Sequence, residues 1–401
     1  MARQKGIVCW FKSVLRVWRR EFYLVFKDPG VLLFFFALPT LYPIVYTLIY
    51  NPEVVKDQPI AVVDHCRSAM SRDLARMVDA TEAAKIYGYA NSLDEARRMM
   101  NRKEVYGILL IPEDYDKKIE RGEAPTVTFY SDMSLLLRYR TFVSGITDVQ
   151  LALLDKLRSD QSNRLGLASE VVPGIDIKQE SVMMGDPTQG FASFIMPAIL
   201  VLIIQQSLIL GVTMLCAGSS ERRRRNGGVD PLAVPAPSGA VLIGKVLCYI
   251  IIYIPMLIYT LHFVPVMFSL PHLGDVWHYM LFLLPMLVGA SMLGICVSAF
   301  VTERESSLLV VVFTSVIFLF LSGITWPRYA MNGFWRLLGD CVPATWGMEG
   351  FVRLNSNGAA LSEESHCMAM MWILAAVYGV FAYLLTRYRD RYGRLRAGQL
   401  I

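Results

Sequence analysis

Residues 31–50 read VLLFFFALPTLYPIVYTLIY, a stretch in which no side chain carries a charge. The hydrocarbon core of a bilayer is about 30 Å thick, and an α-helix needs roughly 20 apolar residues to cross it. The stretch is too long for the apolar part of a signal peptide, and no A-x-A-like cleavage site follows it. It therefore predicts a transmembrane helix, which Pro39 and Pro43 are expected to kink.

Five further uncharged stretches place the chain among multi-pass membrane proteins. Charged residues make up only 18% of the 401 residues, against about 25% in soluble domains, and they lie mostly between the apolar stretches. The sequence thus predicts an α-helical membrane protein with six transmembrane helices, one followed by five, and an inserted extracytoplasmic α/β domain over 51–188. The five later stretches are 191–216, 246–270, 278–302, 306–327 and 367–386.

The distribution of lysine and arginine predicts the orientation of these helices. Basic residues cluster before the first helix, between the second and third, and after the sixth, and Arg304 lies between the fourth and fifth. The short loops on the other side carry only Arg328, Arg336 and Arg353. Because cytoplasmic loops hold the excess of positive charge, we expect both termini in the cytoplasm and the inserted domain outside the cytoplasmic (inner) membrane.

The inserted segment has the pattern of a small soluble domain. Apolar and β-branched runs at 60–64, 84–89, 105–111 and 126–130 predict strands, which alternate with amphipathic helices. A long helix over 134–164 follows, with an apolar stripe that is typical of core or coiled packing. The near-neutral charge of the segment gives no indication of nucleic-acid binding.

No group of side chains in the sequence predicts catalysis, a cofactor site or a metal site. Asp64, His65 and Cys66 lie together after the first strand, but no second group at metal-ligand spacing accompanies them, so a strand-end turn is the better interpretation. The seven cysteines contain no C-x-x-C pair and predict neither a zinc nor a redox site. Cys341 and Cys367 are both expected outside, and the sequence leaves open whether they form a disulfide.

Residues 10–27 read WFKSVLRVWRREFYLVFK and predict an amphipathic helix at the membrane surface, within an interfacial segment over 1–30. Apolar side chains recur at three- and four-residue spacing, and basic ones occupy the rest of the helix. The pattern fits an anchor attracted to anionic lipid, and it also fits a docking surface for a cytoplasmic subunit. The candidate residues are Trp10, Lys12, Arg16, Trp18, Arg19 and Arg20.

Residues 238–246, SGAVLIGKV, have the glycine and lysine spacing of a phosphate-binding loop. Such a loop follows a β-strand and carries Ser or Thr after the lysine to hold magnesium, whereas here a proline-rich loop precedes the motif and Val246 follows Lys245. We interpret the stretch as the start of the third transmembrane helix. Lys245 would then extend to the lipid headgroups, and Gly239 and Gly244 would allow close packing on a neighbouring helix.

The order of residues over 219–246 resembles the coupling loop of ABC-2 type transporter permeases. In that family an E-x-E-x-G-T-x-E core is followed by a proline and then by G-K. Here the acidic residue after the glycines is displaced, and the four arginines, which also serve as an orientation signal, depart from the pattern. The resemblance implies a cytoplasmic coupling loop over 217–240 with the candidate residues Glu221, Arg222, Arg223, Arg224, Arg225, Gly227, Gly228, Leu232 and Pro235.

A second resemblance lies nearer the C-terminus. LSGITWP at 321–327 is similar to the S-G-x-x-x-P signature of the same family, and PATWGMEGFVR at 343–353 is similar to its P-x-x-x-x-x-E segment. Between and after them the family has short helices that dip back into the outer leaflet, which implies an outer re-entrant region over 325–366. The resemblance covers essentially the whole chain, including five spans within 189–401.

The resemblance implies the permease subunit of an ATP-driven ABC exporter that moves an amphiphilic or hydrophobic substrate outward. The implied partners are ABC ATPase subunits, which hold ATP and magnesium, and a second permease copy in a homodimer or heterodimer; a periplasmic adaptor protein is a further candidate. The chain itself is expected to be no enzyme. Gln205 and Gln206, deep in the second span, fit the lining of a translocation path and equally fit hydrogen bonds between helices.

Two other classes of function are weighed against export. A membrane-anchored receptor or tether would use the outer domain to bind a ligand or an envelope protein, but six spans are more than an anchor needs. An intramembrane hydrolase would need charged or catalytic side chains within the spans, and the sequence offers none. Nothing in the residues selects a particular substrate.

Overall fold

The computed structural model describes residues 2–50, 55–121, 126–132, 136–165, 190–301 and 303–398, without the side chains of 2–7, 136, 157–165 and 390–398. The chain divides into two compact units. The membrane unit comprises Met1–Asn51 and Met183–Ile401, and the α/β unit comprises Pro52–Val182. The last residues of the predicted inserted domain, 166–188, lie outside the described residues.

Six helices among the described residues are long and apolar enough to cross a membrane, which confirms the predicted fold class. The first span runs over Pro29–Tyr50. It is preceded by α1 (Ala2–Lys27) and consists of α2 (Pro29–Leu32), the π-helical turn η1 (Leu33–Ala37) and α3 (Leu38–Tyr50). Asp28 is the N-cap of this span. Its Oδ1 accepts hydrogen bonds from the backbone N–H groups of Gly30 (3.1 Å) and Val31 (3.4 Å).

The remaining spans follow the α/β unit, and α8 lies at their centre. In its most apolar stretch 89% of the residues are buried, against 17% in the corresponding stretches of α12 and α15 and 22% in that of the first span. The helices are α8 (Phe191–Arg225), α9 (Ser238–Ile258) with its continuation through the π-turn η2 (Tyr259–Phe263) and α10 (Val264–Met267), α11 (Val276–Val297), α12 (Arg304–Leu321) and α15 (Ser365–Gly398).

Three short elements connect α12 to α15 and lie within the segment predicted to be re-entrant. They are the 3₁₀ turn η3 (Arg328–Ala330), α13 (Gly333–Asp340) and α14 (Pro343–Ser356). α14 is buried against α8, α11 and α15. Arg328 stabilises this segment between α12 and α15, because it pairs with Asp340 and Glu349 and lies over the ring of Trp346.

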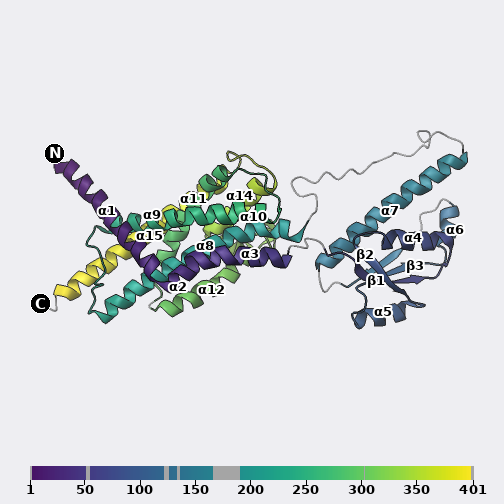
Figure 1. Cartoon of the computed structure of the whole chain (residues 1–401), viewed down its shortest axis with the longest axis horizontal. Helices are drawn as coiled ribbons and strands as arrows, with labels where there is room; N and C mark the ends of the chain where they lie inside the picture. Colours follow the sequence, from purple (N-terminus) through teal and green to yellow (C-terminus); the bar gives the residue numbers. More distant parts are fainter. Residues whose placement is uncertain are drawn as a thin grey trace. The chain divides into compact units, whose positions relative to one another are not determined.

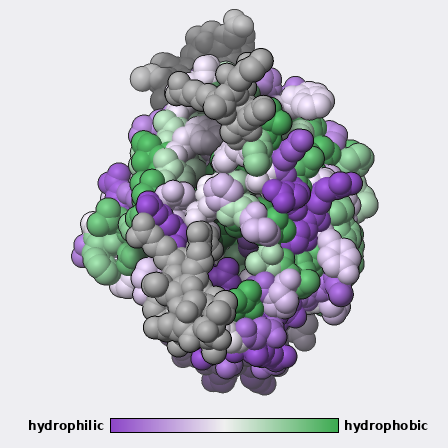
Figure 2. All heavy atoms as spheres, turned by 90° about the vertical axis from the view of Figure 1, so that its left-hand side faces the viewer, coloured by the Kyte–Doolittle hydropathy of each residue, from purple (hydrophilic) through white to green (hydrophobic). Residues whose placement is uncertain are grey.

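Both chain termini lie at the same end of the membrane unit, as an even number of spans requires (Figure 1). The connection from α8 to α9 lies at this end too, because its residues line one cavity together with residues of α1 and α15. We call this the terminal end of the membrane unit. Viewed from this side, hydrophilic and hydrophobic side chains are interleaved over the surface (Figure 2).

The α/β unit is built on a four-stranded sheet with strand order β2–β1–β3–β4. β1 is parallel to β2 and β3, and β4 is antiparallel to β3. The predicted strands are all present, although the third begins at Gly107 instead of Val105 and the fourth at Thr128. The strands are β1 (Gln58–Asp64), β2 (Ala84–Tyr89), β3 (Gly107–Ile111) and β4 (Thr128–Ser131).

Alternate residues of the central strands point to opposite faces of the sheet, and each face has its own core. Ile60 and Val62 pack under α4 (Ala69–Asp79), α6 (Tyr115–Glu120) and the long helix α7 (Leu136–Leu165). Ala61 and Val63 face α5 (Leu93–Asn101). Figure 1 shows this layering. The predicted start of the long helix at 134 lies outside the described residues.

Candidate functional site

The four arginines of the predicted coupling loop form the last turn of α8, so the helix continues beyond its apolar run before the chain turns. Cationic side chains are favourable there, because the C-terminus of a helix carries a partial negative charge. Gly227 and Gly228 then adopt positive φ angles of 64° and 105°. The Gly228 N–H donates to the Arg223 carbonyl (2.7 Å), which is the Schellman arrangement that ends helices.

Asp230, directly after this turn, holds the connection to both α8 and α1. Its Oδ2 accepts hydrogen bonds from the Ser219 hydroxyl (2.7 Å) and Arg20 Nη2 (3.1 Å), and its Oδ1 accepts from Arg222 Nε (3.0 Å). The backbone N–H of Leu232 also donates to Oδ1 (3.1 Å). Burial alone would raise the pKa of Asp230, but the hydrogen bonds from Arg222 and Ser219 outweigh it and lower the pKa to about 2.

Helix α1 has three faces instead of the two of a simple amphipathic helix. One face, which includes Val14 and Val17, is buried and packs along α9. A second face is apolar but exposed, with Phe11 and Leu15 as its most clearly exposed members. The third carries the exposed basic residues. Such a helix can bind another helix and an apolar surface such as lipid at the same time.

The buried face of α1 carries one acid, Glu21, which pairs with the lysine of the SGAVLIGKV stretch. Glu21 Oε1 lies 3.1 Å from Lys245 Nζ and accepts a hydrogen bond from the Tyr249 hydroxyl (2.6 Å). The side chains are 1% and 12% exposed for Glu21 and Lys245. Burial would raise the pKa of Glu21, but the charges of Lys245 and Arg20 together hold it below its ordinary value.

The position of Lys245 differs from the one expected from the sequence. α9 begins at Ser238, so Lys245 lies two turns inside the helix and its side chain points into the protein. It is paired with Glu21 instead of extending to the lipid headgroups. The two glycines of the stretch also differ: a Cβ at Gly244 would lie 2.8 Å from the Val14 carbonyl oxygen, whereas the nearest atom to a Cβ at Gly239 is 3.9 Å away. Only Gly244 is needed for the close approach of α1.

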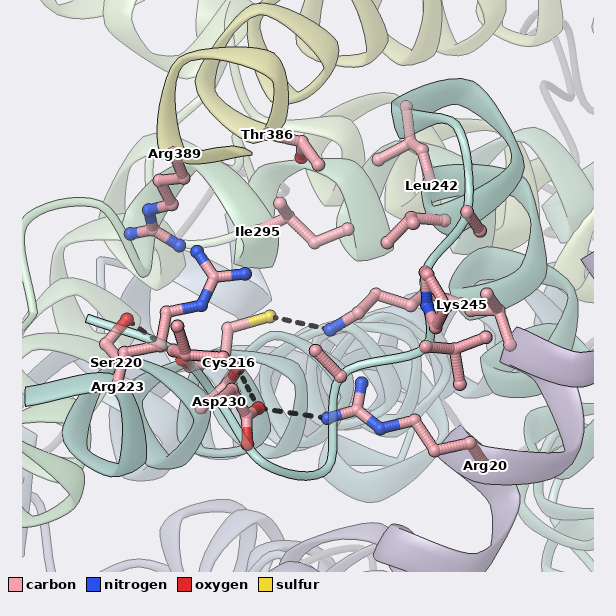
Figure 3. A pocket seen from close by; sticks show the side chains of 18 of the residues that line it. Arg20, Cys216, Ser220, Arg223, Asp230, Leu242, Lys245, Ile295, Thr386 and Arg389 are labelled. Carbon is pink, nitrogen blue, oxygen red and sulfur yellow. Dashed lines mark hydrogen bonds and ion pairs between the residues drawn. The ribbon is translucent and has the colours of Figure 1, made fainter. Parts of the chain in front are cut away.

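Arg20, Asp230 and Lys245 are among the residues that line a cavity of about 830 Å³ at the terminal end of the membrane unit. Figure 3 shows Arg20 and Lys245 on one side of it and the guanidinium groups of Arg223 and Arg389 on the other. Arg389 belongs to α15 and donates to the Ser298 carbonyl (2.9 Å), which ties α15 to the end of α11. The cavity thus brings together α1, α8, α9, α11 and α15.

A further ion pair at this end joins the start of the first span to α12. Arg304, the first residue of α12, pairs with Asp28. Gly218 of α8 makes room for it, because a Cβ there would lie 2.7 Å from Arg304 Nε. Because Asp28 directly follows α1, a movement of α1 would also displace α12 through the Asp28–Arg304 ion pair.

The structure places the remaining sequence-predicted residues in three groups. Exposed residues at the terminal end include Leu232 and Pro235 of the connection and Arg224 and Arg225 of α8; Arg225 donates to Glu221 (2.6 Å). On α1, Lys12, Arg16 and Arg19 are exposed, and Trp10 and Trp18 are half-buried. Gln205 is fully buried and Gln206 half-buried, and no described residue hydrogen-bonds to either amide.

Cys341 and Cys367 are free thiols in this structure, the first exposed and the second buried. Among the described residues no group of three or more His, Cys, Asp and Glu could hold a metal ion. The ion pairs of Asp230, Glu21 and Asp28 join different helices at the terminal end, and we call them the terminal-end network. Such ion pairs between helices are suited to transmitting movement.

Sequence reasoning missed the acids that organise this network. Asp230 and Glu21 were not among the candidate residues, and Lys245 was assigned to the headgroups. One signal for Glu21 is present in the sequence: residues 14, 17, 21, 24 and 25 recur at helical spacing, and Glu21 is the only charged residue among them.

Two comparisons with known proteins place the chain in context. The family model described as ABC-2 family transporter protein matches residues 29–384. The chain is also similar to the linearmycin resistance permease protein LnrN of Bacillus subtilis (strain 168), with 22% identity over 397 residues. That alignment covers 91% of this chain and 97% of the relative.

Proposed function

Because this chain belongs to the ABC-2 family of transporter proteins, we propose that it exports an amphiphilic or hydrophobic substrate, driven by force that an ATPase subunit applies at the terminal end. The chain is a multi-pass membrane protein and the permease component of an ABC transporter, and ATP hydrolysis belongs to a partner ATPase subunit. Family membership favours this function over that of a membrane-anchored receptor or tether.

The observation that carries the proposal is the buried contact between α1 and the α8–α9 connection. Arg20 binds Asp230, and the neighbouring Glu21 binds Lys245 of α9. A push on the exposed part of the connection, at Leu232 and Pro235, would therefore move α1 and α9 together. Such a coupled element can act as one rigid lever between the ATPase subunit and the spans.

The first experiment tests where the ATPase docks. We would coexpress the chain with a candidate Walker-motif ATPase, sought first among the genes that neighbour its own, and measure how much ATPase copurifies. Leu232→Asp places a charge on the exposed connection, and Leu273→Asp is the matched control on the exposed connection between α10 and α11 at the other end. We expect at least a tenfold loss of ATPase with Leu232→Asp only. Equal copurification in both variants would contradict the proposed docking surface.

The second experiment tests substrate class and direction. The name of the Bacillus relative links that protein to linearmycin resistance, so linearmycin would head a panel of amphiphilic compounds tested on a deletion strain. A compound to which the strain becomes sensitive would then be offered to inside-out vesicles that contain the chain and its ATPase. ATP-dependent accumulation is expected for export. Accumulation in right-side-out vesicles instead would identify an importer.

The third experiment tests the proposed orientation, with both termini cytoplasmic and the α/β unit outside the cytoplasmic membrane. The excess of basic residues at the terminal end supports it. Reporter fusions after residues 100 and 398 are expected to be active outside and inside the cell, respectively. The opposite pattern would remove the terminal end from reach of a cytoplasmic ATPase.

We further propose that the transporter contains a second permease copy, identical or related. The outward-facing apolar surfaces of the first span and α12 support a partner in addition to lipid. Crosslinking of single cysteines introduced at Leu309 or Phe313, which are exposed on α12, is expected to yield a dimer. If every cysteine position tested on α12 yields only monomer after crosslinking, the result would argue against this pairing. A periplasmic adaptor would be sought by copurification from crosslinked cells.

A further inference from the structure

Four polar side chains form a connected group at the end of the membrane unit opposite the terminal end, which we call the far end. They are His262 of the π-turn η2, His272 of the connection between α10 and α11, Tyr279 of α11 and Asn355 of α14. His262 Nδ1 lies 2.7 Å from His272 Nε2, and His272 Nδ1 lies 3.1 Å from Asn355 Oδ1. The Tyr279 hydroxyl donates to the same oxygen (2.9 Å). We call these four residues the histidine network.

Asn355 fixes the direction of the hydrogen bonds in the histidine network. Its Nδ2 donates to the Pro271 carbonyl (3.0 Å), so its Oδ1 is the atom that faces His272. An amide oxygen only accepts, and therefore His272 Nδ1 carries a proton. In a neutral imidazole the second nitrogen is then an acceptor, so His262 Nδ1 donates to His272 Nε2. With both rings neutral, every hydrogen bond in the network has one donor and one acceptor.

Proton uptake by both histidines destroys this match. Both nitrogens of an imidazolium are donors, so the N–H groups of His262 Nδ1 and His272 Nε2 would point at one another across 2.7 Å. The two positive charges would also repel each other. Even a single proton places a charge beside Tyr279 and Asn355, which are fully buried, and burial disfavours the charged form of a histidine.

No carboxylate of the described residues pairs with either histidine of the network. The charged side chains on the neighbouring segments are bound to one another: Asp275 with His278 (3.8 Å), and Glu349 and Glu364 with Arg353 (2.6 and 3.5 Å). The other elements in contact with η2 are α3, α8, α9 and α10, and their residues 38–50, 191–216 and 246–267 include no Asp, Glu, Lys or Arg. A tyrosine such as Tyr279, whose ordinary pKa is about 10, stays neutral in acid. Burial accordingly lowers the pKa of His272.

The histidine network holds the C-terminal end of α14 against two other segments. It reaches the third span through His262, and the backbone supports its contact with the connection, because the Leu273 N–H donates to the Asn355 carbonyl (3.1 Å). The ring of Tyr279 packs edge-on against Phe351 of α14, with 4.9 Å between the ring centroids. α14 also forms one wall of a cavity of about 640 Å³, which residues of α8, α13 and α15 line as well. A change in the network would therefore displace a wall of that cavity.

We propose that the histidine network is a pH-sensitive switch at the far end of the membrane unit. At neutral pH the uncharged network holds α14 to the third span and to the connection between α10 and α11. In acid, proton uptake breaks the hydrogen bond between the two imidazoles, and the end of α14 separates from the connection. With the orientation proposed above, the far end faces the outside of the cell, so the switch responds to external pH. π-helical turns such as η2 are common at functional sites, and histidine is the side chain that titrates in this pH range.

The test measures backbone hydrogen exchange in the purified permease alone, so neither export nor an ATPase enters the result. The protein would be held in nanodiscs at pH 7.5 and 5.0, and mass spectrometry would follow the peptides that contain Leu273 and residues 353–358. Exchange times would be scaled for the pH dependence of the chemical exchange step. One histidine with an ordinary pKa of about 6.5 raises the open population at pH 5.0 about thirtyfold at most, and we expect protection to fall at least about fivefold.

Three variants assign the response to the network. His272→Gln removes a titrating ring and should reduce the change to less than about twofold, because the remaining histidine no longer faces a second one. His278→Gln is the matched control, because His278 is exposed at the start of α11 and pairs with Asp275; it should respond as the wild type does. In Leu273→Cys/Gly358→Cys the two Cβ atoms would lie 3.9 Å apart, within the range for a disulfide. That disulfide should abolish the response, and its reduction should restore it. If His272→Gln unfolds at pH 7.5, the disulfide variant carries the test by itself.

Three results would overturn the proposal. The first is equal protection of the wild type at both pH values. The second is an undiminished response in His272→Gln, or a loss in His278→Gln as large as in His272→Gln, which would assign the titration to another group. The third is an undiminished response in the oxidised disulfide variant, which would place the acid-induced opening elsewhere in the membrane unit. None of these results bears on export, which the experiments above test separately.

Discussion

The pair Glu21–Lys245 allows the sharpest prediction about this protein. The Glu21 carboxylate is 1% exposed and receives the Lys245 ammonium at 3.1 Å and the Tyr249 hydroxyl at 2.6 Å. In Glu21→Gln the amide oxygen can still accept from Tyr249, but Lys245, which is 12% exposed, loses its counter-charge and keeps only the Cys216 thiol at 3.5 Å. Removing one partner of a buried pair costs about 3–5 kcal/mol.

The double variant Glu21→Gln/Lys245→Met separates the pair from the individual side chains. With both charges gone, no ion remains buried without a partner, and well-packed neutral replacements of buried pairs are often nearly as stable as the original. We therefore expect the double variant to recover most of the loss, with a coupling free energy of about 2 kcal/mol or more.

The assay is reversible unfolding in mixed micelles by titration with sodium dodecyl sulfate, followed by far-ultraviolet circular dichroism. Glu221→Gln is the matched control, because Glu221 makes an exposed pair with Arg225, whose side chain is 76% exposed; it should lose less than about 0.5 kcal/mol. The reasoning is refuted if Glu21→Gln costs no more than Glu221→Gln, or if the effects of Glu21→Gln and Lys245→Met simply add.

Three further predictions concern neighbouring features. Gly244→Val should destabilise by about 1–3 kcal/mol through overpacking against the Val14 carbonyl, whereas Gly239→Ala should be neutral or gain up to about 1 kcal/mol; thermal unfolding of the two variants compares them. The pKa of Asp230 is lowered to about 2, so its contribution is complete above its ordinary pKa of about 3.9 and is lost as the pH falls toward 2. The loss is on the order of 2 kcal/mol, and Asp230→Asn should show less stability at pH 7 and a flatter acid limb in unfolding titrations. Burial lowers the pKa of His272. Its Nε2 lies 2.7 Å from His262 Nδ1, and its Nδ1 lies 3.1 Å from the Asn355 amide oxygen and 3.4 Å from the Tyr279 hydroxyl. Because the unfolded chain then binds the proton more tightly, stability should fall as the pH drops below about 6.5, and His272→Gln should reduce this slope; an unchanged slope would mean that another group is responsible.

Much of the membrane architecture follows from local sequence. A span must hide its backbone within its own hydrogen bonds and expose apolar side chains to lipid, so each one is visible as an uncharged run such as 31–50, and all six predicted spans are present in the structure. The four strands of the α/β unit were equally visible, because strand and helix periodicities differ. The sequence also indicated the terminal-end segments, since the arginines of α8 and the helix over 10–27 are local patterns.

Helix ends were less predictable. The run of four arginines reads as a loop, but the favourable charge at the helix C-terminus and the two glycines with positive φ place it inside α8. Lys245 directly precedes the uncharged run 246–270 and so reads as the residue before the span, but α9 begins seven residues earlier because the SGAVLIG stretch is itself helical. In both cases a charged residue interrupts the apolar pattern without ending the helix.

The sequence by itself determined how many helices cross the membrane, where they lie in the chain and which end collects the positive charge, because lipid and water act on each segment separately. Only the tertiary structure decided that Glu21 meets Lys245, that Arg20 meets an aspartate 210 residues away, and that four cations share one cavity. Such pairings depend on how the helices pack together, and no local pattern of residues records that.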